Sequence, residues 1–226
     1  MAASAEEILL LLKSRANPQG AAGMARFGIN VSNALGLSIP ELRQIAKQIG
    51  TDHPLALKLW ASELHEARLL ASFIDDPHQV SETQLEAWAR DFDSWDLCDQ
   101  VCGLFEATPF AYEKVREWSS RPEEFVKRAA FAILAGLAVH DRISDDSRFE
   151  EFFPILAAQA VDNRNFVRKA VNWALRNIGK RNRHLNLLAV QWAKTIAGQE
   201  SQSARWIGKD ALRELTAEKT LSRLKC

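Results

Sequence analysis

The sequence has no long hydrophobic run, and its composition is that of an ordinary globular protein. It has 226 residues, of which 47% are hydrophobic and 26% charged, enough to bury a sizeable core. No stretch approaches the roughly 20 uncharged apolar residues that a membrane helix needs. Glu6 and Glu7 precede the first short apolar run, where an export signal would carry basic residues. We therefore expect a soluble cytoplasmic protein with no membrane partner.

Cysteines are few. The sequence has three, Cys98, Cys102 and Cys226, and such an odd, sparse set does not form a disulfide framework. Cys98 and Cys102 are four residues apart in an apolar helical pattern. A zinc site would need two more ligands nearby, and the five histidines are scattered. We interpret the two residues as core cysteines, with zinc ligation as the alternative.

The formal net charge is zero, but the charged residues are unevenly distributed along the chain. Residues 1–110 hold 8 Lys and Arg against 15 Asp and Glu, whereas residues 111–226 hold 21 against 14. Residues 161–226 alone hold 14 against 5. Such asymmetry indicates a surface that binds a polyanion. A solvated basic face is the equally weighted alternative.

The sequence shows no convincing strand alternation, and apolar residues recur at intervals of three and four throughout. Ser38 with Glu41, and Ser81 with Gln84, resemble capping boxes. The chain therefore predicts helices at 5–15, 39–49, 53–61, 64–75, 81–91, 94–106, 110–118, 122–138, 146–159, 163–179, 182–197, 201–214 and 216–223.

Short, closely joined helices are typical of stacked antiparallel helix pairs. The segment Phe125-Val-Lys-Arg-Ala-Ala aligns with Phe166-Val-Arg-Lys-Ala-Val at a separation of 41 residues, the period of HEAT-like repeats. We predict an all-α protein, a HEAT-like α–α superhelix with a concave groove, as one domain over residues 1–226. A helical bundle without repeats is the alternative.

Two tryptophans lie off the apolar stripe of their predicted helices. In 163–179, Trp173 lies well over 90° from the centre of the stripe, and Lys169, Arg176 and Lys180 share its side. In 94–106, Trp95 and Asp99 are one turn apart on one face. The alternatives are that Trp173 packs on a neighbouring repeat, Trp95 is a staple at the helix start, and Asp99 is a solvated acid.

An arginine shows the same pattern in the predicted helix 122–138. Arg128 lies opposite the stripe, with small Ala132 and Ala135 beside it leaving room for a ligand. An outward arginine is ordinarily surface, and Lys127 is the alternative inward cation, although the helical wheel favours Arg128. Equivalent helices of a solenoid line one concave wall, so we expect Trp95, Asp99, Arg128 and Trp173 to converge.

Two indoles, a carboxylate and cations suit one particular chemistry. A carboxylate stabilises an oxocarbenium-like sugar while a glycosidic bond breaks, and Asp99 can also position the attacking water. Indole faces attract a cation, such as a purine alkylated at N3 or N7. Arg128 and the row of Lys169, Arg176 and Lys180 can hold phosphates.

Several segments together resemble the AlkD-like DNA alkylation repair proteins. They are Gly36-Leu-Ser-Ile-Pro40-Glu-Leu-Arg43, Trp95-Asp96-Leu-Cys-Asp99, Val126-Lys-Arg128-Ala-Ala, Val167-Arg-Lys-Ala-Val-Asn-Trp173-Ala-Leu-Arg176 and Ala204-Arg-Trp-Ile-Gly-Lys-Asp-Ala-Leu-Arg-Glu-Leu215. The resemblance implies a HEAT-like fold that cradles duplex DNA and excises N3-methyladenine and N7-methylguanine without metal or cofactor. It implies that Trp95, Asp99, Arg128 and Trp173 are catalytic, and that the lesion enters no deep pocket.

The expected function is therefore that of an alkylpurine DNA glycosylase of base excision repair, acting as a monomer on duplex DNA with alkylated bases. The expected DNA contacts are Lys169, Arg176, Lys180, Arg168, Arg205 and Lys209. Two alternatives remain: a non-catalytic helical scaffold that binds DNA or protein, and a solenoid that binds protein alone.

Overall fold

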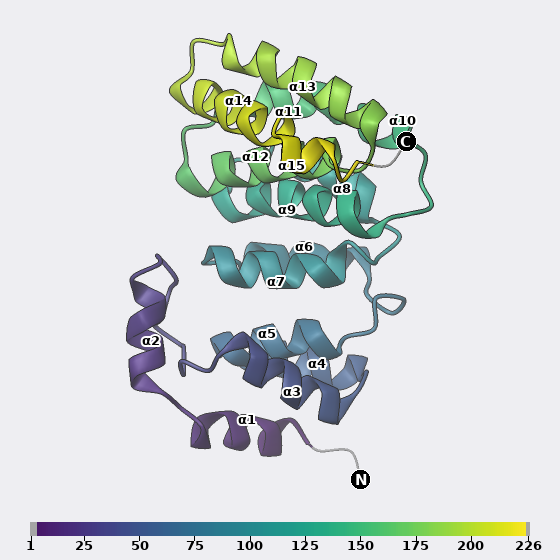
Figure 1. The fold of residues 1–226 in the computed structure, drawn as a ribbon. Coiled ribbons are helices and arrows are strands. Elements are labelled where there is room, and N and C mark those ends of the chain that lie inside the picture. Colours follow the sequence, from purple (N-terminus) through teal and green to yellow (C-terminus); the bar gives the residue numbers. More distant parts are fainter. Residues whose placement is uncertain (1–3, 225–226) are drawn as a thin grey trace. The chain divides into compact units, whose positions relative to one another are not determined.

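The computed structural model describes residues 4–224, which form fifteen helices and no strand. The all-helical prediction is thus confirmed. The helices divide into two compact units, one ending at Phe110 and the other beginning at Ala111 (Figure 1). This boundary coincides with the change from acidic to basic composition.

The first unit contains seven helices. They are α1 (Ala5–Ser14), α2 (Pro18–Ala25), α3 (Ile39–Ile49), α4 (His53–Trp60), α5 (His65–Ile74), α6 (Glu82–Arg90) and α7 (Trp95–Phe105). The capping box of Ser38 and Glu41 is present at α3. Ser81 accepts the Gln84 amide at α6, but the Gln84 side chain donates to Asp75 instead of closing the box.

Helix α2 was not predicted, since the sequence indicated no helix between residues 15 and 39. Proline is well placed at the first position of a helix, where no backbone donor is required, and Asn17 caps the helix by accepting from the Gly20 amide. A Cβ on Gly20 would lie 2.3 Å from the carbonyl oxygen of Gly36. Glycine at position 20 therefore lets α2 pack against the loop that precedes α3.

The second unit contains eight helices. They are α8 (Ala111–Trp118), α9 (Glu124–His140), α10 (Asp146–Glu150), α11 (Phe153–Gln159), α12 (Asn165–Gly179), α13 (Arg183–Ala197), α14 (Gln202–Leu215) and α15 (Glu218–Leu221). The sequence predicted a single helix over 146–159, where the structure has α10 and α11. Pro154 lies in the first turn of the second of these, since a proline in the interior of a helix costs a hydrogen bond.

Helices α9, α12 and α14 form a parallel row. Phe125 near the start of α9 lies with its ring centroid 5.5 Å from that of Phe166 near the start of α12, and Asn177 of α12 donates to the carbonyl of Ala135. The two segments that align at a separation of 41 residues thus occupy equivalent positions in successive helices. This arrangement is that of a repeat.

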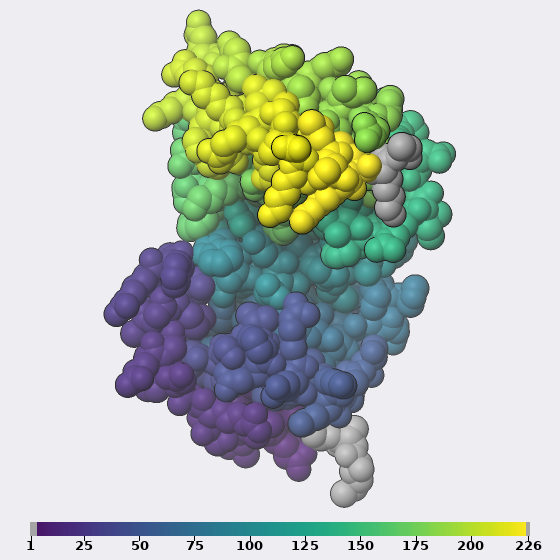
Figure 2. Space-filling view, viewed as in Figure 1, coloured from purple at the N-terminus to yellow at the C-terminus, as the bar shows by residue number. Residues whose placement is uncertain are grey.

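A ladder of polar contacts joins α12 to α14. Its steps are Arg168 over the ring of Trp206, Asn172 to Asp210, and Arg176 to Glu214. Each step links residues 38 apart, so the two helices run parallel and in fixed register. Figure 2 shows α14 and α15, in yellow, at the visible surface of the second unit.

Candidate active site

Trp95 and Asp99 lie on α7, and each is partly exposed. The opposite face of this helix is buried. Leu97, Cys98 and Val101 are no more than 1% exposed, as the apolar spacing predicts. Cys98 and Cys102 are 0% and 2% exposed, which confirms them as core residues. Cys226 lies outside the described residues. Among residues 4–224, no group of His, Cys, Asp and Glu side chains is arranged to hold a metal.

The indole of Trp95 is fixed by a hydrogen bond. Its Nε1 donates to the backbone carbonyl of Phe27 at 3.0 Å, in the loop that follows α2. The same loop carries Asn30, whose side chain donates to Asp93 just before α7 at 2.7 Å. Helix α2, which the sequence did not predict, therefore leads into the loop that orients Trp95.

A buried ion pair holds the start of α7 to α5. His65 Nε2 lies 2.9 Å from Asp96 Oδ2, and the two side chains are 3% and 13% exposed. Burial alone would lower the pKa of His65, but the hydrogen bond and charge of Asp96 raise it above its ordinary value. Burial alone would raise the pKa of Asp96, yet the His65 contact lowers it. The contact therefore favours the charged form of both groups.

The neighbouring residue of α5 anchors the loop that precedes α3. Glu66 is fully buried, and its carboxylate accepts the backbone amides of Leu35, Gly36 and Leu37 at 2.8, 2.6 and 3.3 Å. Hydrogen bonds to a charged acceptor stabilise more than neutral ones. His65 thus holds the start of α7, and Glu66 holds the loop before α3. Sequence periodicity gave no signal of either role.

Arg128 is not where the sequence placed it. The residue is 6% exposed, and its small neighbours Ala132 and Ala135 are 2% and 0% exposed, so the prediction of an open, ligand-accessible face is wrong. The helical wheel assumes one buried face, whereas α9 packs against both α8 and α12. The Arg128 guanidinium donates to the carbonyl of Phe166 in α12 at 2.6 Å.

Trp173 is partly exposed and lies one turn from the exposed Lys169 on α12. The buried face of the helix is formed by Val167, Ala170, Val171, Ala174, Leu175 and Ile178, all 0% exposed. The predicted orientation of Trp173 away from this face is confirmed.

The six predicted DNA contacts differ in their availability. Lys169, Arg205 and Lys209 are exposed, and Arg168 lies on Trp206. Arg176 and Lys180, in contrast, both pair with Glu214. The pattern within one helix could not predict that a carboxylate of another helix would neutralise these two cations.

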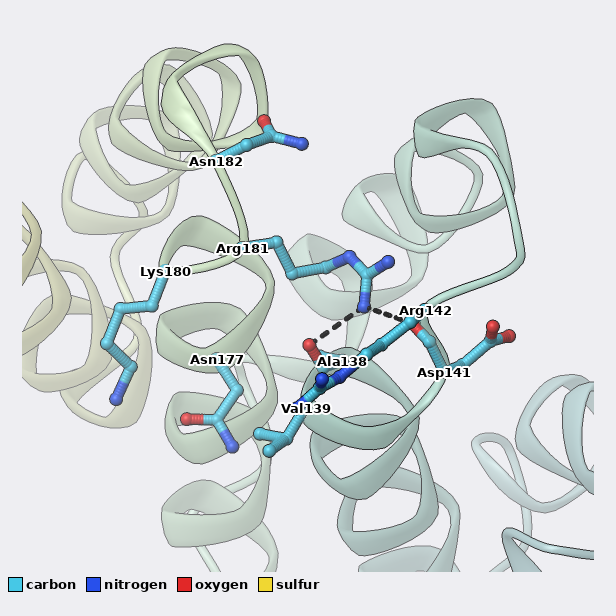
Figure 3. A pocket seen from close by; sticks show the side chains of 8 residues that line it. All are labelled: Ala138, Val139, Asp141, Arg142, Asn177, Lys180, Arg181 and Asn182. Atoms are coloured by element: carbon cyan, nitrogen blue, oxygen red, sulfur yellow. Dashed lines mark hydrogen bonds between the residues drawn. The ribbon is translucent and has the colours of Figure 1, made fainter. Parts of the chain in front are cut away.

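A cavity of about 450 Å³ lies at the ends of α9 and α12 (Figure 3). Of the predicted site residues it contains Lys180 alone. The Arg181 guanidinium there donates to the carbonyls of Leu137, Ala138 and Asp141. It therefore caps the C-terminal end of α9. This cavity does not include the tryptophans or Asp99.

Similarity to known proteins agrees with these observations. A family model described as DNA alkylation repair enzyme matches residues 8–215. The chain belongs to this family. A comparison with curated proteins gave no significant match.

One solved structure is similar at a TM-score of 0.78 and 18% sequence identity, over 93% of this chain and 95% of the other. It is described as representing a new family of proteins related to the HEAT-like repeat DNA glycosylases with affinity for branched DNA structures. This likeness confirms the HEAT-like fold. No helix within residues 4–224 is long and apolar enough to cross a membrane.

Proposed function

We propose that this member of the DNA alkylation repair enzyme family is a glycosylase that excises cationic alkylated purines, such as N3-methyladenine and N7-methylguanine, from duplex DNA. The observation that carries the proposal is the pair of Trp95 and Asp99, one turn apart on α7, with the indole fixed by the Phe27 carbonyl at 3.0 Å. A carboxylate next to an ordered aromatic ring suits a positively charged base on a sugar.

In the proposed reaction the bond between the sugar C1′ and the purine nitrogen breaks. Its electron pair moves to the base, which leaves as a neutral molecule because its positive charge is cancelled. Asp99 stabilises the oxocarbenium-like sugar and orients the water that attacks C1′; the water's proton passes to solvent. Such a leaving group needs no strong general acid and no metal.

The proposal also gives catalytic roles to Arg128 and Trp173 of the second unit, as the family resemblance implies. An indole face attracts a cationic base, and this is the role proposed for Trp95 and for Trp173, which is partly exposed on α12. Because Arg128 is buried and bonded to Phe166, its role is to hold the start of α12 and contribute positive charge beside the DNA. Lys169, Arg205 and Lys209 bind phosphates, and the protein acts as a monomer.

The test is release of methylated purines from duplex DNA treated with a methylating agent. Asp99→Asn should lower the rate by about a hundredfold or more while retaining DNA binding. Glu113→Gln is the matched control, since Glu113 is an exposed acid on α8 and its loss changes net charge equally. Unchanged base release by Asp99→Asn would refute the role of Asp99.

A second candidate is a non-catalytic DNA-binding scaffold. It is favoured by the described affinity of the structurally similar family for branched DNA. It predicts salt-sensitive DNA binding by the wild-type protein with no base release. The same assay therefore separates the two candidates.

A further inference from the structure

Trp206 is a large aromatic residue that the proposed reaction does not use. It lies on α14 and is 37% exposed, while Ile207 and Ala211 on the other face of that helix are fully buried. Leaving so much of an indole in water forgoes the stabilisation that burial would bring. A partly exposed tryptophan among polar neighbours is a frequent feature of binding surfaces.

One neighbour of the indole is a cation from the adjacent helix. The guanidinium carbon of Arg168 lies 5.0 Å from the centre of the Trp206 ring, a cation–π contact. Arg168 also donates to the side chain of Asn165 at 3.2 Å, and its Nε is buried without a hydrogen-bond partner. The arginine is thus held beside the ring without a carboxylate partner within the described residues.

Further cations surround this pair. Lys209 is one helical turn from both Arg205 and Trp206 on α14, and both cations are exposed. Lys169 follows Arg168 on α12 and is exposed as well. No ion pair forms at any of these three cations within residues 4–224, in contrast to Arg176 and Lys180, which Glu214 neutralises.

An aromatic ring beside cations is the arrangement with which proteins bind single-stranded nucleic acid: the ring stacks on a base and the cations hold the backbone. Within a continuous duplex both faces of each base are covered by its neighbours. An indole can therefore stack only on a base at a strand end, a branch or an unpaired segment.

We propose that the Arg168–Trp206 pair is a stacking site for an unpaired base of DNA, with Arg205 and Lys209 binding the flanking phosphates. This inference rests on the proposed binding of DNA but not on base excision. It gives the protein a second contact, outside the proposed catalytic residues, that selects DNA with an interrupted duplex.

The experiment compares three DNAs as competitors at one salt concentration: relaxed closed circular duplex, which has no ends, a linear duplex with a short single-stranded tail, and a single strand. Trp206→Ala should weaken binding of the tailed and single-stranded DNA by about tenfold and leave the circular duplex unchanged. Trp206→Phe should restore part of the loss, since phenylalanine keeps a ring. Leu187→Ala is the control, because Leu187 is 65% exposed on α13.

Equal weakening of all three DNAs by Trp206→Ala, or no weakening of any, would overturn the stacking site. Excision is measured separately, as purine release from methylated circular duplex. Wild-type protein that prefers tailed DNA but releases no base would refute the glycosylase and leave the stacking site supported. Base release together with equal binding of tailed and circular DNA would refute the stacking site alone.

Discussion

Glu214 of α14 provides a direct test of the proposed binding of DNA by cations of α12 and α14. Its carboxylate contacts Arg176 and lies 2.9 Å from Lys180 Nζ. Burial alone would raise the pKa of Glu214, but the hydrogen bond from Lys180 and the charges of Arg176 and Lys180 lower it. The ionised carboxylate therefore competes with phosphates for Lys180, and Glu214→Gln should strengthen DNA binding.

The expected size follows from counterion release. Each additional phosphate neutralised by the protein steepens the dependence of log affinity on log salt by about 0.9. Arg176 remains paired with Asp210 at 3.6 Å, so Lys180 is the cation that the substitution frees. If Lys180 reaches a phosphate, the slope steepens by ~0.9, so affinity falls about threefold further between ~50 and ~200 mM salt than in the wild type. The three side chains are 28–39% exposed, so the lost ion pairs should cost only about 1 kcal/mol of stability.

The assay is a salt titration of duplex affinity for the wild type, Glu214→Gln and Glu218→Gln. Glu218 lies on α15, is exposed and has no cation within ion-pair distance in residues 4–224, so its substitution changes net charge without releasing a partner. An unchanged salt slope in Glu214→Gln, or the same increase in both variants, would refute the reasoning.

Three further predictions concern stability. Gly208→Ala should destabilise the second unit by about 1–3 kcal/mol, because its Cβ would lie 2.4 Å from a backbone nitrogen of α13. Gly103→Ala is the control, because a Cβ there meets open space and should be neutral or stabilise α7 by up to about 1 kcal/mol. Equal denaturation midpoints of the two variants would contradict this prediction. Glu66→Ala should cost at least about 3 kcal/mol, since three backbone amides lose a charged acceptor, and hydrogen exchange should accelerate at those amides; unaltered exchange would exclude the anchoring role. The His65 pKa is raised, so its contribution is complete below the unfolded value near 6.5 and is lost as pH rises through the folded value. The Asp96 pKa is lowered, so its contribution is complete above the unfolded value near 3.8 and is lost as pH falls through the folded value. Denaturant unfolding of the wild type should show a decline in stability above pH 6.5 that His65→Gln lacks. An identical pH profile of the two proteins would contradict the pair's role.

The sequence alone determined the features that depend on local periodicity. Apolar spacing placed the helices and the buried faces of α7 and α12, including Cys98 and the outward side of Trp173. The recurrence of a segment beginning with Phe125 at Phe166 predicted a repeat, and the two rings are in contact. These features could be predicted because a helix that buries one face records that face in its own sequence.

The tertiary structure decided what depends on a second helix. Arg128 is buried because α9 has neighbours on more than one side, and no single-helix pattern contains that information. Glu214, 38 residues after Arg176, neutralises it because α12 and α14 run parallel in register. Trp206 stood in a segment noted for its family resemblance, but only its contact with Arg168 distinguishes it from a surface residue. Spacing along a chain records which face of a helix is buried, whereas ion pairs and ring contacts between helices depend on register, which only packing fixes.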